Sequence, residues 1–123
     1  IGPLLERLRQ EGVRTAVVSN KPDRTTRTLA ARFFPELDGA MGQREGIASK
    51  PAPDMVRAAL DQLHAAPEEA LYVGDSEVDV ATARNAGLDM IGVAWGFRGR
   101  AALEAAGAPL VADTPEQLLD MLQ

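Results

Sequence analysis

The chain has 123 residues, of which 46% are hydrophobic; this is enough apolar material for one folded domain and excludes a disordered segment. Its formal net charge of −5 argues against nucleic acid as the main partner, because the chain has no overall basic field to attract a phosphate backbone. The absence of cysteine excludes a disulfide scaffold, a thiolate metal site and a cysteine nucleophile.

The first half of the chain alternates helical and strand-like patterns. Leucines at helical spacing predict a helix that begins at Pro3 and ends before Gly12. An apolar run at residues 15–18 leads into polar residues, as a buried strand leading into a loop does. The other expected elements of this half are a helix from its N-cap Asp23 to Phe34 and a brief strand at 39–42.

The second half continues this alternation. Pro53 is expected in the first turn of a helix that runs to Leu63, and Gly87 is the expected C-cap of a helix over 76–86. The segment Thr114-Pro115-Glu116-Gln117 combines a capping box with a proline at the first helical position and predicts a last helix through Leu122. Apolar runs predict strands at 71–73, 90–94 and 110–112.

Strands that alternate with helices predict an α/β fold with a three-layer, doubly wound, Rossmann-like parallel sheet. No repeat or linker divides the sequence, so we expect residues 1–123 to form one domain. No apolar run approaches the roughly 20 residues of a spanning helix, and the first residues lack a signal-peptide pattern. We therefore expect a cytoplasmic protein with no membrane partner.

Two carboxylates follow the strand predicted at 71–73. Gly74 allows a sharp turn, Asp75 comes directly after it, and Asp79 lies one helical turn later. Carboxylates at this spacing can face one point and offer the hard oxygen ligands that Mg²⁺ prefers. The alternative is that Asp75 or Ser76 only caps the following helix and that Asp79 lies in solvent.

Two further segments suit phosphate binding. Ser19 and Asn20 end the strand at 15–18, where a hydroxyl, an amide and free backbone N–H groups can hold phosphate oxygens. Lys50 precedes Pro51, which favours an extended backbone and so fixes the direction of the lysine. The alternatives are a polar strand end without a ligand and a solvated surface lysine.

The order and setting of these motifs resemble the haloacid dehalogenase (HAD) superfamily, in particular its phosphoglycolate phosphatase-like branch. The resemblance runs from Leu4 to Leu122. It rests on the segments Val18-Ser19-Asn20-Lys21-Pro22, Lys50-Pro51-Ala52-Pro53-Asp54, Val73-Gly74-Asp75-Ser76 and Trp95-Gly96-Phe97-Arg98. The last segment follows a strand end, where it either lines the pocket or packs against the sheet edge.

The resemblance implies a role for each of these polar residues. Ser19 would bind the transferring phosphoryl group with Asn20 beside it, and Lys50 would stabilise the charge of the phosphoryl group and of the acidic cluster. Asp75 would be a magnesium ligand, and Asp79 would support the metal directly or through water and outer hydrogen bonds. Ser19, Lys50, Asp75 and Asp79 are thus the expected catalytic residues, and Mg²⁺ is the expected cofactor.

One motif of the family is missing from this sequence. In the family, an Asp-x-Asp motif on the first strand supplies the nucleophile and the general acid–base, and no Asp-x-Asp occurs here. The helical cap that follows that strand in this branch is also absent. The sequence therefore predicts a C-terminal portion of the family's core domain that is incomplete at the first strand, and it does not reveal the substrate that the cap would select.

The missing strand has a consequence for the fold. In the family it lies between the strand that ends at Ser19 and the strand that ends at Asp75. Its loss would remove buried apolar side chains worth about 1.5–3 kcal/mol each and would expose two strand edges. We expect a separate N-terminal segment to supply the strand, or the two edges to close up or to pair between chains; open edges in a single chain would count against this argument.

Two functional hypotheses follow. In the first, the intact protein hydrolyses a small phosphorylated metabolite, with phosphoglycolate as the favoured candidate, through a phosphoaspartate whose aspartate is not in this chain; the chain alone is then inactive. A sugar-phosphate mutase is a variant of this hypothesis, and the cap that would distinguish the two is not in this sequence. In the second, the chain is an inactive remnant or an interaction module that binds phosphate and metal.

Overall fold

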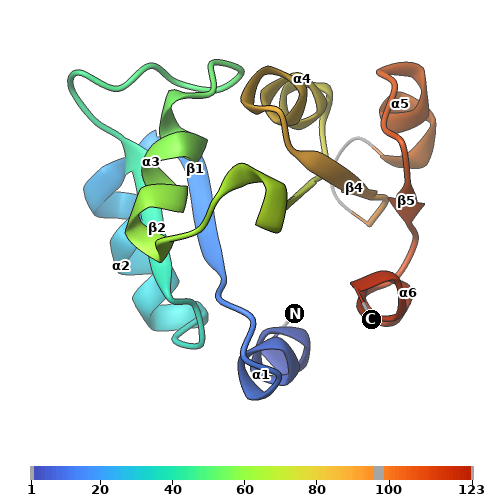
Figure 1. The fold of residues 1–123 in the computed structure, drawn as a ribbon, viewed down its shortest axis with the longest axis horizontal. Helices are drawn as coiled ribbons and strands as arrows, with labels where there is room; N and C mark the ends of the chain where they lie inside the picture. The colour runs from blue at the N-terminus through green and yellow to red at the C-terminus, as the bar shows by residue number, and fades with distance from the viewer. Residues whose placement is uncertain (1, 96–98, 123) are drawn as a thin grey trace.

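The computed structural model describes residues 2–95 and 99–122, and Figure 1 shows its ribbon. Helices and strands alternate almost throughout, as the sequence predicted. The elements are α1 (Gly2–Gln10), β1 (Ala16–Pro22), α2 (Asp23–Phe33), β2 (Gly39–Gln43), α3 (Asp54–Leu63), the short 3₁₀ helix η1 (Pro67–Glu69), β3 (Leu71–Gly74), α4 (Glu77–Ala86), β4 (Asp89–Val93), α5 (Gly99–Ala105), β5 (Val111–Ala112) and α6 (Pro115–Leu122).

All strand pairs of the described chain are parallel, and helices cover both faces of the larger sheet. In β4, Ile91 and Val93 pack with α1 and α6, whereas Met90 packs with α4 and α5. This alternation is the period of two that a strand buried on both faces requires. The predicted α/β, doubly wound arrangement is confirmed.

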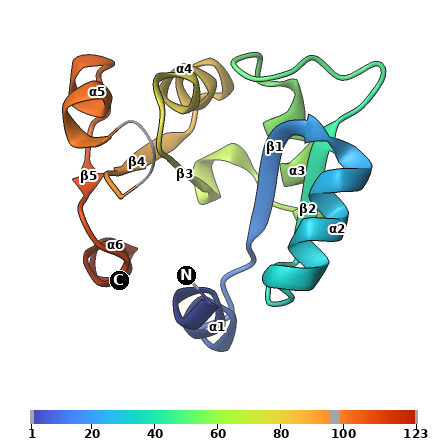
Figure 2. The ribbon, with the colours of Figure 1, turned by 180° about the vertical axis from the view of Figure 1, so that it is seen from behind.

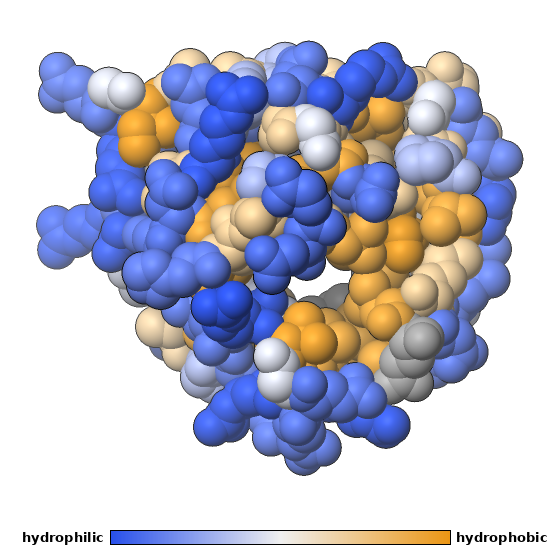
Figure 3. All heavy atoms as spheres, viewed as in Figure 1, coloured by the Kyte–Doolittle hydropathy of each residue, from blue (hydrophilic) through white to orange (hydrophobic). Residues whose placement is uncertain are grey.

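The strands form two separate sheets. One pairs β1 with β2, and the other has the order β3-β4-β5. Figure 2 shows β1 standing apart from β3 and β4, and Figure 3 shows an opening in the surface with hydrophobic residues below and to the right of it and hydrophilic residues to its upper left. Leu71 and Val73 of β3, the edge strand of the larger sheet, are 38% and 42% exposed, which is unusual for a strand of a parallel sheet.

The open edges correct one expectation from the sequence. The edges of β1 and β3 do not close up, and within the described ranges no segment lies between them. The open edges of this single chain count against the expectation that both edges must be covered, and closure of the edges is wrong. A strand supplied by a separate segment and pairing between chains stay predictions.

The helices α3 and α4 join the two sheets. Val56 and Leu60 of α3 form a buried cluster with Ala86 of α4. Val18 of β1 and Tyr72 of β3 both pack against this cluster, so each sheet is attached to the same apolar layer. This layer fixes the carboxyl ends of β1 and β3 relative to each other without hydrogen bonds between the strands.

Several local predictions are confirmed and others are corrected. Ser76 and Gly87 cap α4 at its two ends, and the Thr114 hydroxyl accepts a hydrogen bond from the Gln117 N–H at the start of α6. Asp23 is not an N-cap, because its carboxylate accepts a hydrogen bond from the Gly42 N–H instead. Pro53 precedes the first residue of α3, and the sequence analysis did not predict α5. Among the described residues, no helix has the length and apolar character needed to cross a membrane.

Candidate functional site

The carboxylate of Asp79 is the centre of a polar cluster at the start of α4. Its side chain is only 8% exposed, so the alternative in which it lies in solvent is wrong. Oδ1 accepts hydrogen bonds from the Lys50 ammonium at 2.9 Å and from the Tyr72 hydroxyl at 2.7 Å. Oδ2 accepts hydrogen bonds from the Asp75 N–H at 3.0 Å and from the Ser76 hydroxyl at 3.1 Å. Each oxygen therefore has two donors.

These contacts limit how the two aspartates can hold a cation. Asp79 keeps its bonds to Lys50 and to the β3–α4 turn, whereas the half-buried Asp75 side chain accepts no hydrogen bond from the described residues. Within those ranges no three His, Cys, Asp or Glu side chains group as metal ligands. Mg²⁺ needs only one or two carboxylates when waters and a phosphate complete its shell. The donor set fits such a half-site, with Asp75 as the free carboxylate.

Lys50 is held through both its side chain and its backbone. Its N–H donates to Asn20 Oδ1 at 2.9 Å, and Asn20 Nδ2 donates to the Lys50 carbonyl at 3.3 Å. Asn85 of α4 donates to the next carbonyl, that of Pro51, at 2.8 Å. The Lys50 side chain is 14% exposed, which corrects the alternative of a solvated surface lysine.

Ser19 and Asn20 have different surroundings. The Asn20 amide is used to fix the Lys50 backbone, so the structure gives it a bridging contact between β1 and the loop before α3. The half-buried Ser19 hydroxyl accepts a hydrogen bond from the Lys21 N–H at 3.1 Å. Hydrogen bonds thus connect Asn20, Lys50, Asp79 and Asp75, and Ser19 lies next to this network as the neighbour of Asn20 in the sequence.

The charge state of the cluster follows from its contacts. Burial on its own raises the pKa of Asp79, but the hydrogen bond and charge of Lys50, with smaller contributions from Tyr72 and the Asp75 N–H, leave this pKa below its ordinary value. Burial and then the charge of Asp79 raise the pKa of the Tyr72 hydroxyl, which therefore stays protonated and donates. At neutral pH the cluster contains an ionised Asp79 and a neutral Tyr72.

Tyr72 and Asn85 belong to this network, although no sequence pattern pointed to them. Tyr72 precedes Gly74 by two residues, so the strand period alone places both on the face of β3 that carries α4. Its hydroxyl partner Asp79 lies seven residues away in the sequence. Asn85 is 34 residues from its partner Pro51, and no local pattern signals that contact.

Gly74 leaves the space that Asp79 occupies. A methyl group at Gly74 would lie 2.7 Å from Asp79 Oδ2 and closer still to Asp79 Cβ. Gly74→Ala is therefore expected to displace Asp79 and to lower the unfolding free energy by about 1–3 kcal/mol, as overpacking does. Thermal unfolding measures the loss. Gly39→Ala in β2 is the matched control, because a methyl there would meet its nearest atom at 3.4 Å, and an equal loss in both variants would contradict the prediction.

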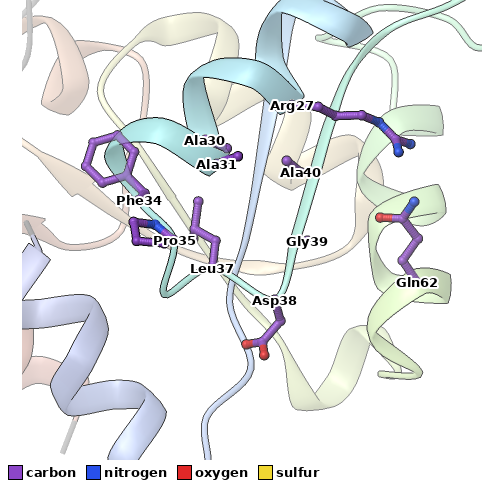
Figure 4. A pocket seen from close by; sticks show the side chains of 10 residues that line it. All are labelled: Arg27, Ala30, Ala31, Phe34, Pro35, Leu37, Asp38, Gly39, Ala40 and Gln62. Carbon is purple, nitrogen blue, oxygen red and sulfur yellow. The ribbon is translucent and has the colours of Figure 1, made fainter.

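One described cavity lies away from this cluster. It has a volume of about 570 Å³ and lies near the first residue of β2, between α2 and α3 (Figure 4). Its lining residues are Arg27, Ala30, Ala31, Phe34, Pro35, Leu37, Asp38, Gly39, Ala40 and Gln62. Of the loop predicted to line the pocket or pack against the sheet edge, Gly96, Phe97 and Arg98 lie outside the described residues, and Trp95 is 38% exposed.

Known proteins are similar to this chain in sequence and in fold. The family model of haloacid dehalogenase-like hydrolases matches residues 1–87. A protein from Caldanaerobacter subterraneus assigned as a pyrophosphatase PpaX is 42% identical over 98 residues, which cover 75% of this chain and 43% of that protein. Pyrophosphatase PpaX of Bacillus mycoides is 32% identical over 123 residues, which cover 96% of this chain and 56% of that protein.

A solved structure agrees with these matches. A Lactobacillus delbrueckii protein assigned as a phosphoglycolate phosphatase superposes with a TM-score of 0.94 and 43% identity; the match covers 98% of this chain and 51% of that one. The chain thus spans about half the length of the relatives that it matches.

Proposed function

Because the chain belongs to the haloacid dehalogenase-like hydrolase family, we propose that the intact protein is a magnesium-dependent phosphomonoester hydrolase of the phosphoglycolate phosphatase-like branch. The observation that carries this proposal is the buried pair of Lys50 and Asp79, joined by hydrogen bonds to the turn that carries Asp75. A fixed ammonium beside a free carboxylate at the end of a strand suits the binding of a phosphoryl group and its counter-ion.

In this proposal each residue has a separate task. The Ser19 hydroxyl binds a phosphoryl oxygen, and Asn20 sets the position of Lys50 through its backbone. Lys50 neutralises charge on the phosphoryl group, which costs little reorganisation because its ammonium is already held by Asp79. Asp75 would hold Mg²⁺, with Asp79 supporting the turn behind it, and the bound ion would supply further positive charge to the phosphate oxygens.

The attacking carboxylate is proposed to lie on a strand between β1 and β3. The unpaired facing edges of these strands and the exposed side chains of Leu71 and Val73 support this position. A strand there would pair with both edges, cover both side chains and end at the same rim as Ser19 and Asp75. The nucleophile is then not a residue of this chain, which lacks the Asp-x-Asp motif.

Phosphate release by the intact protein tests this proposal. We expect turnover of p-nitrophenyl phosphate with Mg²⁺, loss of turnover with excess EDTA, and a decrease in kcat of about 100-fold or more in Asp75→Asn, since a metal ligand is lost. A polypeptide of residues 1–123 alone should show no turnover above buffer. Turnover that is independent of Mg²⁺ and unaffected by Asp75→Asn would contradict the assignment.

A second candidate substrate is pyrophosphate, because the two relatives above are named pyrophosphatases. The same assay with phosphoglycolate and pyrophosphate as competing substrates separates the two by their kcat/KM values. An intact protein that hydrolyses neither, yet binds inorganic phosphate with Mg²⁺, would instead support the hypothesis of a non-catalytic binding module.

A further inference from the structure

Tyr72 connects the two helices that join the sheets. Its ring packs against the cluster of Val80 and Ala83 on α4 and also against the cluster of Val56 and Leu60 on α3. A tyrosine has only two side-chain torsions, so this packing fixes the direction of its hydroxyl at a small cost in entropy.

The Tyr72 hydroxyl closes a ring of hydrogen bonds. It donates to Asp79 Oδ1 at 2.7 Å and accepts from the Lys50 ammonium at 3.4 Å, while Lys50 also donates to the same Oδ1 at 2.9 Å. Each of the three groups therefore contacts the other two. The contacts join the strand β3, the helix α4 and the loop before α3.

Lys50 needs such a constraint. Its ammonium is at the end of a flexible four-carbon chain, and the Asn20 contacts fix only the backbone of this residue. A single carboxylate oxygen can be approached from many directions, whereas two partners at a fixed separation define one position for the ammonium.

We propose that Tyr72 is a positioning residue, whose hydroxyl holds the Lys50 ammonium and the Asp79 carboxylate in one arrangement at the carboxyl end of β3. Its catalytic consequence rests on the proposed function, because it assumes that Lys50 contacts a phosphoryl group. The arrangement itself is a property of the described chain and can be tested without turnover.

The chain offers an internal reference for this test, because its two lysines are Lys21 and Lys50. Lys21 is exposed, whereas the Lys50 side chain is 14% exposed and ion-paired. In the intact protein, acetylation by N-hydroxysuccinimide acetate, followed by peptide mass spectrometry, gives the Lys50-to-Lys21 rate ratio. Tyr72→Phe keeps the ring and removes the hydroxyl, and we expect this ratio to rise about threefold to tenfold, the range for a lost hydrogen bond to a charged group.

Loss of the Tyr72 hydroxyl is also expected to change the kinetics of the intact protein. In Tyr72→Phe, kcat for p-nitrophenyl phosphate should fall by about threefold to tenfold while KM changes little, since the disordered ammonium affects charge development more than ground-state binding. Thr82→Val is the matched control. It removes a buried hydroxyl bond within α4, from Thr82 Oγ1 to the Val78 carbonyl at 2.6 Å, and touches neither Lys50 nor Asp79.

The outcomes separate the hypotheses. Tyr72→Phe with an unchanged labelling ratio, or Thr82→Val with an equal rise, would overturn the positioning role and leave Tyr72 as a packing residue. If the ratio rises but the wild-type protein hydrolyses no phosphate ester, the positioning role stands and the proposed function fails.

Discussion

Asp79→Ala is expected to lower the unfolding free energy by about 3 kcal/mol, the largest stability effect of any substitution considered for this protein. The variant removes the acceptor of four hydrogen bonds and leaves the ammonium of Lys50 without its ion-pair partner in a site that is only 14% exposed. An uncompensated buried charge costs more than the original pair contributed. Urea or thermal unfolding measures the loss. Asp120→Ala, an exposed aspartate of α6, is the matched control and should change the unfolding free energy by less than about 0.5 kcal/mol.

The stabilisation of the fold by the ionised Asp79 carboxylate depends on pH and is expected to be lost in acid. The folded-state pKa of Asp79 lies below the ordinary value of about 3.9. Its ionised form therefore stabilises the fold fully above about pH 4, and the contribution disappears as the pH falls through the lowered folded-state pKa. The stability difference between the wild type and the isosteric Asp79→Asn variant should shrink between pH 5 and pH 2.5. A difference that stays constant over this range would show that the charge of Asp79 is not its source.

Lys50→Met in the intact protein is expected to reduce kcat by about 100-fold or more, an effect on activity as large as the one expected for Asp75→Asn. The methionine keeps most of the apolar stem but removes the charge that Asp79 and Tyr72 hold in place. Asp79 retains its other three donors, so the fold loses less than in Asp79→Ala. The steady-state rate with p-nitrophenyl phosphate, measured well below the unfolding temperature, separates this effect from stability.

The control for that substitution is Arg57→Met, which removes an exposed cation from α3; within the described ranges the Arg57 side chain makes no hydrogen bond or ion pair to Lys50, Tyr72 or Asp79. Its kcat should stay within about twofold of the wild type, since exposed charges contribute little when the solvent screens them. If the two variants lose activity equally, the positive charge of the surface as a whole, and not the fixed ammonium, would be the relevant feature. The role of Lys50 in the proposed function would then have to be abandoned.

The sequence alone was sufficient to predict the order of the elements other than η1 and α5, and the strand ends that carry the polar residues. Apolar runs and helix caps are local patterns, so β3, α4 and its caps Ser76 and Gly87 could be located without coordinates. Residue spacing alone also places Asp75 directly after a strand and Asp79 one helical turn later. Asp23 is not the N-cap that the sequence predicted, because its carboxylate accepts a hydrogen bond from the distant Gly42 N–H on β2 and not from an N–H of α2.

Only the tertiary structure determines which of these side chains form hydrogen bonds and ion pairs with one another. Lys50 meets Asp79 across 29 residues of sequence and Asn20 across 30, and local patterns carry no information on such pairs. Packing against α3 and α4 places the Tyr72 hydroxyl beside Asp79, a buried carboxylate that accepts four hydrogen bonds. The division into two sheets likewise depends on which strand edges find partners, and that is a long-range property of the folded chain.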